Sequence, residues 1–102
     1  MIYIGNYKEF EQDCKVSLKD SCEKGKYANQ EKIAEYLKNG GKNIMISTSY
    51  HKDVFTFENT GMSEICKEDG TYSWFNILAY YVEKYNLRLP TDFEEHILSK
   101  SN

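Results

Sequence analysis

The sequence lacks most of the features that support metal, cofactor or membrane chemistry. Its three cysteines, Cys14, Cys22 and Cys66, form no C-x-x-C pair, which argues against a disulfide framework and a four-ligand zinc site. No apolar run approaches the roughly twenty residues that cross a bilayer, and residues 1–15 have no signal-peptide pattern. With one proline and six glycines there is no low-complexity linker either. We therefore expect one folded domain over residues 1–102, in a reducing cytoplasm and without a cofactor.

Acidic residues outnumber basic ones, with 16 Asp and Glu against 13 Lys and Arg. The formal net charge is −3, and Arg88 is the only arginine. Residues 52–102 carry the imbalance, with more Asp and Glu than Lys and Arg, and no basic patch is present that would follow a line of phosphates. The composition therefore disfavours nucleic-acid binding and favours a basic protein as the partner.

The spacing of apolar residues predicts an α+β domain of the order ααβββαα. Asn6 and Glu9 form a capping-box pattern, which predicts a first helix with an apolar stripe that includes Cys14. Asp69–Gly70 marks a tight turn between strands. We expect a small antiparallel sheet of three to four strands, with about four helices over one face. The predicted helices cover 6–20, 29–41 and 74–85 and a segment from Thr91, and the strands cover 42–50, 52–61 and 62–67, with 1–4 able to pair at an edge.

Six aromatic residues crowd into the fourteen positions 72–85. A helix that is capped by Ser73 and has Leu78 at the centre of its inner face turns most of these rings toward the core. Tyr80 is the exception, because it falls among the polar residues of the opposite face. The core-facing residues of this predicted helix are Trp74, Phe75, Tyr81, Val82 and Tyr85.

Catalytic patterns are missing. His51 and His96 are far apart in sequence and lie in no metal-binding spacing. Cys66 and His51 are conceivable as a nucleophile pair, but the acidic neighbours of Cys66 would raise the pKa of its thiol. Gly40–Gly41 precedes a strand, so it is interpreted as a helix stop rather than a phosphate cradle. We therefore predict neither catalytic residues nor metal ligands.

What remains is a surface for binding a protein. Strands with one solvated face would display carboxylates near their ends and turns, and exposed tyrosines are amphipathic anchors of the kind that interfaces favour. The candidate residues for charge complementarity are Asp53, Glu58, Glu64, Glu68 and Asp69, and the candidate anchors are Tyr50 and Tyr80.

Three segments, DVFTFENTG, DGTYSW and LAYYVEKYNLRLPTDFEEHI, resemble a pattern in small bacterial immunity proteins of polymorphic and contact-dependent toxin systems. The likeness covers about residues 45–98. It implies a cytoplasmic inhibitor that binds one toxin domain, often a nuclease, and occludes its active site without turnover. An acidic inhibitor suits a basic nuclease, because its carboxylates can occupy positions meant for phosphate. The matching residues are Asp69, Gly70, Trp74, Leu78, Tyr81, Tyr85, Asn86, Leu89 and Pro90.

Three alternatives stay open. One is an inhibitor of a host defence enzyme, encoded by a phage or mobile element, which would differ only in its target. Another is a small hydrolase or transferase that uses Cys66 or a carboxylate pair. The last is a homodimer in which the sheet edge or the Tyr80 face is self-complementary.

Overall fold

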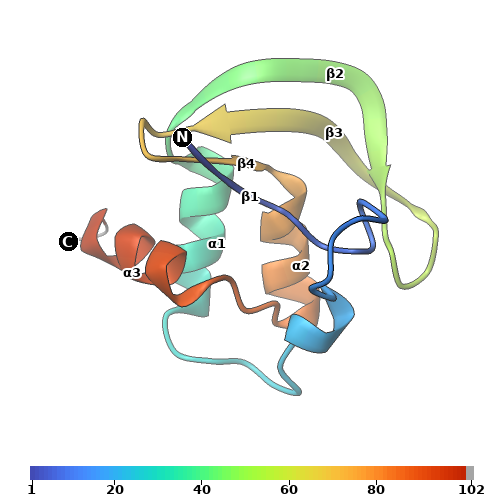
Figure 1. Cartoon of the computed structure of the whole chain (residues 1–102), viewed down its shortest axis with the longest axis horizontal. Coiled ribbons are helices and arrows are strands. Elements are labelled where there is room, and N and C mark those ends of the chain that lie inside the picture. The colour runs from blue at the N-terminus through green and yellow to red at the C-terminus, as the bar shows by residue number, and fades with distance from the viewer. Residues whose placement is uncertain (101–102) are drawn as a thin grey trace.

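A computed structural model describes residues 1–100, and these residues form an α+β fold, as the sequence predicts (Figure 1). They contain four strands, three α-helices and one short 3₁₀ helix. In chain order the elements are β1 (Ile2–Ile4), η1 (Lys19–Ser21), α1 (Gln30–Asn39), β2 (Lys42–Lys52), β3 (Asn59–Glu68), β4 (Tyr72–Phe75), α2 (Ile77–Tyr85) and α3 (Thr91–Lys100).

The strands form one mixed sheet in the order β1-β4-β3-β2. The pairs β2–β3 and β3–β4 are antiparallel, whereas β1 runs parallel to β4. The expectation of a purely antiparallel sheet is therefore wrong at one pairing. A parallel pair needs a long connection, and here β2, β3 and α1 all lie between the two paired strands.

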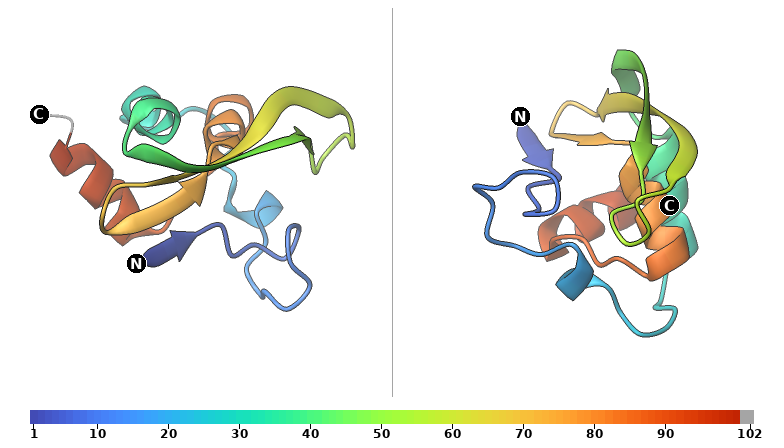
Figure 2. Two further views of the ribbon diagram at one scale, coloured as in Figure 1. Left: turned by 90° about the horizontal axis from the view of Figure 1, so that it is seen from above. Right: turned by 90° about the vertical axis from the view of Figure 1, so that its right-hand side faces the viewer.

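The three α-helices lie on one side of the sheet, below it in Figure 1, and Figure 2 shows α1 and α2 side by side. Trp74 of β4 is fully buried beneath the sheet, and its indole N–H donates a hydrogen bond to the carbonyl of Leu37 at 2.9 Å. This bond joins the sheet to the last turn of α1. Other fully buried side chains of this core include Tyr81, Phe93, Leu18, Ile33, Leu78 and Ile97.

The first predicted helix is absent, because residues 5–18 form turns and loop instead. The carboxylate of Glu9 serves a distant turn rather than the capping box. It accepts hydrogen bonds from the backbone amides of Leu18 at 2.7 Å and Lys19 at 3.0 Å, and from the hydroxyl of Ser17 at 2.8 Å. The capping residue thus fastens the loop to the start of η1. The sequence predicts about four helices, whereas residues 1–100 contain three α-helices.

The predicted strand boundaries also shift. Residues 53–58 form a loop, and β3 begins only at Asn59, so two predicted strands become one loop and one long strand. Trp74 and Phe75 belong to β4 rather than to a helix, and α2 begins at Ile77. Pairing of β4 with both β1 and β3 holds these two residues in the sheet. Trp74 still reaches the core, because it occupies an inward-facing strand position.

Candidate functional site

The sheet face opposite the helices, here called the outer face, carries one row of side chains across all four strands. Register places Met45 beside Cys66 and Cys66 beside Phe75, and paired residues point to the same face. The ring of Tyr3 meets that of Phe75 edge-on, with centroids 6.3 Å apart. Met45 is 53% exposed and Tyr3 39% exposed. The row is therefore an apolar strip that the helices do not cover, with exposed side chains at its two ends and the buried Cys66 between them.

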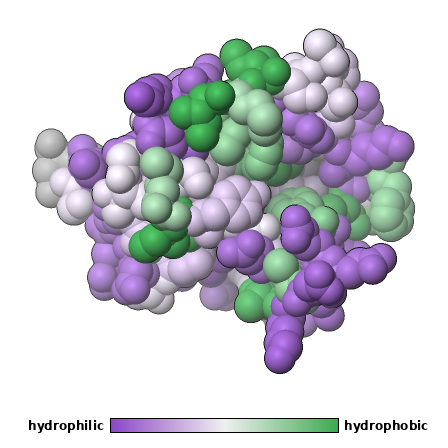
Figure 3. Space-filling model, turned by 45° about the horizontal axis from the view of Figure 1, so that its top comes forward, coloured by the Kyte–Doolittle hydropathy of each residue, from purple (hydrophilic) through white to green (hydrophobic). Residues whose placement is uncertain are grey.

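Strand β2 carries further exposed apolar side chains around this row, although not all of them point to the outer face. Ile44, Ile46 and Tyr50 are each more than half exposed, but Ile46 is paired with Ile65 and therefore points to the opposite face from Cys66. Figure 3 shows apolar side chains gathered over the top of the molecule, where β2 runs. Contiguous exposed apolar surface marks binding sites in folded proteins. The outer face is thus the part of the described chain that is best suited to a partner.

A groove of about 400 Å³ opens beside the apolar row. One wall comes from the N-terminal loop and the other from the β2–β3 hairpin. Aromatic rings, carboxylates and one imidazole line it together, and the carboxylates come from Glu9, Glu11 and Glu64. The remaining lining residues include Tyr3, Phe10, His51, Lys52, Val54 and Phe75.

The imidazole in this groove is held in place rather than poised for catalysis. Nε2 of His51 lies 3.1 Å from Oδ1 of Asn76, and the same oxygen accepts a hydrogen bond from the amide of Ile65. Burial lowers the pKa of His51, which favours the neutral ring. Burial also raises the pKa of the Cys66 thiol, which disfavours the thiolate. The geometry therefore gives no support to a Cys66–His51 nucleophile pair.

Two of the predicted binding residues, Asp53 and Tyr80, meet each other inside the protein. Asp53 is only 1% exposed, and Oδ2 accepts hydrogen bonds from the hydroxyls of Tyr80 and Tyr85, both at 2.6 Å. Oδ1 accepts from the backbone amides of Phe55 and Thr56. The expectation that Asp53 is a surface charge is wrong, because this carboxylate fastens the 53–58 loop to α2.

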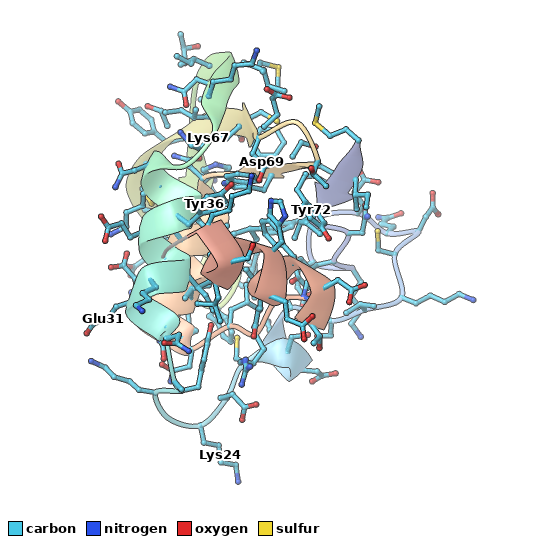
Figure 4. The ribbon with its side chains drawn as sticks, turned by 90° about the vertical axis from the view of Figure 1, so that its left-hand side faces the viewer. Lys24, Glu31, Tyr36, Lys67, Asp69 and Tyr72 are labelled. Atoms are coloured by element: carbon cyan, nitrogen blue, oxygen red, sulfur yellow. The ribbon has the colours of Figure 1, made fainter. Side chains whose placement is uncertain are left out.

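Asp69 is likewise committed to internal contacts. Oδ2 accepts a hydrogen bond from the Tyr36 hydroxyl at 2.6 Å and lies 2.7 Å from Nε2 of His96. Oδ1 accepts from the amides of Thr71 and Tyr72. Figure 4 shows Tyr36 and Asp69 close together beside α3. This cluster links α1, the β3–β4 turn and α3, so the predicted surface role of Asp69 does not fit its side chain, which is 5% exposed.

The other predicted residues are spread over different surfaces. Glu64 and Glu68 lie on the outer face with Cys66, since alternate residues of a strand share a face, and Glu68 is 3.6 Å from Nζ of Lys42. Tyr50 is opposite Ser63 in the register, so it points to the other face of the hairpin. Glu58 is exposed in the loop that precedes β3. The structure therefore brings together only Glu64 and Glu68 at the proposed surface.

Sequence reasoning missed the aromatic part of this site. Tyr3 was expected only to lie in an edge segment, and Phe75 was assigned to a core helix. One signal was available, because the consecutive apolar residues Ile44, Met45 and Ile46 cannot all point to one face of a strand. At least one of them had to be exposed on an edge strand.

A larger hollow of about 750 Å³ runs along the polar side of α1 but has a simpler explanation. Its walls are mostly Lys, Glu and Asn side chains, and Lys38 and Glu83 form an ion pair across it at 2.7 Å. Figure 4 shows Glu31 and Lys24 pointing outward on this side. We interpret the hollow as a solvated helix face. No group of three His, Cys, Asp or Glu side chains suited to a metal ion occurs within residues 1–100.

Comparison with protein-family models, with curated proteins and with solved structures finds no match to this chain. Among the helices of residues 1–100, none has both the length and the apolar character that a membrane crossing requires. The function is therefore argued from the geometry of the outer face.

Proposed function

We propose that this chain is a small acidic cytoplasmic protein that binds a basic protein partner through its outer face and blocks that partner's working surface. The observation that carries the proposal is the apolar row of Tyr3, Phe75, Cys66 and Met45, which has exposed side chains at both ends and lies beside a groove that contains three carboxylates. Apolar contact area supplies affinity, and complementary charge supplies orientation and fast association.

The internal bonding supports a binding role over a catalytic one. His51, Asp53 and Asp69 are each engaged by neighbouring groups in ways that fasten loops and helices. Every buried side-chain nitrogen or oxygen among residues 1–100 has a hydrogen-bond partner. No buried polar side chain in that part of the chain is thus left without a partner.

The partner that we propose is a secreted bacterial toxin domain, such as a nuclease, with this chain as its immunity protein. Occlusion of a phosphate-binding active site needs only a stable complex in which carboxylates face the cationic site. A host defence enzyme blocked by a mobile-element inhibitor would present the same chemistry, and the identity of the captured protein distinguishes the two.

The test uses the tagged chain to capture its partner from the native host, followed by association kinetics with the purified partner. We expect a basic protein whose association rate falls severalfold as salt rises, because exposed charges are screened beyond about 8 Å at physiological ionic strength. Met45→Asp should weaken binding at least tenfold, whereas Val16→Asp is the matched control, because Val16 is 56% exposed and lies outside the outer face.

Two results would contradict the proposal. One is an association rate that does not change with salt, which removes the electrostatic part. The other is equal binding by the Met45→Asp and Val16→Asp variants, which places the interface elsewhere.

A further inference from the structure

We infer that the groove beside the apolar row receives a single cationic side chain, arginine or lysine, from the partner. This inference rests on the proposed function, because it names the chemical group by which a basic partner is recognised. It assigns a binding role to Glu11, Phe10 and Tyr3, for which the sequence pattern gave none.

Charge is the first argument. Glu9, Glu11 and Glu64 line the groove, and Lys52 is the only cationic residue that does so. The side-chain carboxylates of Glu11 and Glu64 form no hydrogen bond or ion pair with any other residue in 1–100. Burial lowers the pKa of His51, which disfavours a compensating positive charge on the imidazole. The groove is therefore net negative, with two carboxylates free to accept hydrogen bonds from a cation.

The aromatic walls are the second argument. Ammonium and guanidinium groups are attracted to the faces of aromatic rings, and the attraction grows when water is excluded. This protein already uses that contact elsewhere, since the Arg88 guanidinium lies 4.1 Å from the ring centre of Tyr27. Within residues 1–100, no lysine or arginine lies over the rings of Tyr3, Phe10 or Phe75. The faces of these rings are therefore not covered by a cation of this chain's residues 1–100, and they lie beside carboxylates that have no partner.

Size and position are the third argument. A volume of about 400 Å³ lies near the small end of ligand-binding cavities, which span roughly 300–1,000 Å³. The groove opens next to the apolar row, so a long side chain from a partner on that row can enter it. A hydrophobic row beside a charged pocket is the usual arrangement of a contact surface with one anchor residue.

The test needs no knowledge of the partner. The ¹⁵N-labelled chain is titrated with N-acetyl-arginine amide, and N-acetyl-citrulline amide serves as the neutral ligand of the same shape. We expect saturable, millimolar binding of the arginine compound, with shifts of amide signals confined to residues that line the groove, and at least fivefold weaker binding of citrulline.

Substitutions at single carboxylates test whether the arginine compound binds in the groove. Glu64→Gln and Glu11→Gln should each weaken binding of the arginine compound threefold or more. Glu35→Gln removes the same charge from the exposed side of α1 and should leave binding unchanged. Equal melting temperatures of all three variants would show that the fold is intact.

Two outcomes would overturn the inference. In one, citrulline binds as well as arginine does. In the other, the shifts spread over the acidic surface, and Glu35→Gln weakens binding as much as Glu64→Gln does. Neither outcome bears on capture of a basic partner through Met45, so failure of the groove and failure of the proposed function remain distinguishable.

Discussion

At the scale of single residues, the carboxylates of this chain divide into two groups. Asp53 and Asp69 are buried and accept hydrogen bonds from tyrosine hydroxyls and backbone amides. Burial opposes ionisation of both groups, but these hydrogen bonds outweigh it and lower the pKa of each. Glu11 and Glu64 have no such partners. Carboxylates of identical chemistry therefore serve either as internal fasteners or as surface charge, according to their surroundings.

The low pKa values of these buried carboxylates predict that the folded protein loses stability in acid. The pKa of Asp69 falls from 3.8 to about 2 on folding. A group whose pKa is lower in the folded state contributes stability above its unfolded pKa and loses it as the pH falls through the folded value. We expect the free energy of unfolding, measured with urea, to be steady near neutral pH and to decline from about pH 4 toward pH 2.

Asp69→Asn tests the origin of that decline. We expect the variant to lose about 1.5–3 kcal/mol at neutral pH, the usual contribution of hydrogen bonds to a charged group, and to show a shallower loss in acid. Asp92→Asn, at an exposed position of α3, is the control. An acid decline of equal slope in the Asp69→Asn variant would assign it to other groups.

At the scale of elements, β4 links the sheet to the helices. Its Trp74 lies against Tyr36 of α1 and Phe93 of α3, with ring centroids 5.5 Å apart in both cases. The strand therefore stabilises the packing of two helices, although it has only four residues.

Trp74→Ala should be among the most destabilising substitutions in the chain. We expect a loss of about 3–5 kcal/mol in the free energy of unfolding, as for other buried aromatic truncations. Phe57→Ala, at a position that is 76% exposed, should cost less than about 0.5 kcal/mol. A loss below about 1 kcal/mol for Trp74→Ala would be inconsistent with its position beneath the sheet.

Local signals in the sequence predicted the elements whose structure depends on near neighbours. The helix that stops at Gly40–Gly41, the turn at Asp69–Gly70, and the last helix from Thr91 are all confirmed. The prediction failed where the structure of a segment depends on contacts with residues far along the sequence. Glu9 binds a turn nine and ten residues away, and β4 is a strand because β1 and β3 flank it.

The candidate site was predictable only in part for the same reason. Charge alone indicated Glu64 and Glu68, which do lie on the outer face. It also indicated Asp53 and Asp69, since a sequence does not show which carboxylates meet a tyrosine hydroxyl from another element. The position of Tyr3 and Phe75 on the outer face follows from sheet order, which depends on pairing across more than sixty residues.

At the scale of the whole molecule, the helices cover one face of the sheet, and the uncovered face ends at the long edge strand β2. Such edges invite pairing with a second copy. In this strand, Lys42 and Lys52 stand at the two ends, and the register shifts at three places. End lysines and bulges are two devices by which proteins prevent edge-to-edge association.

We therefore expect the isolated chain to be monomeric, so that the outer face is free for its partner. Sedimentation at tens of micromolar should give a single species of about 12.0 kDa. A dimer that Met45→Asp dissociates would instead favour the homodimer alternative, with the outer face as its own interface.

The position of Trp74 also gives the protein a built-in optical reporter. It is the only tryptophan of the sequence, it has no exposed surface, and it lies on the opposite side of the sheet from the apolar row. Its emission should therefore be blue-shifted in the native state, move to the red on unfolding, and change little when a ligand occupies the groove. The tryptophans of a bound partner would then dominate any fluorescence change on complex formation, without a label on either protein.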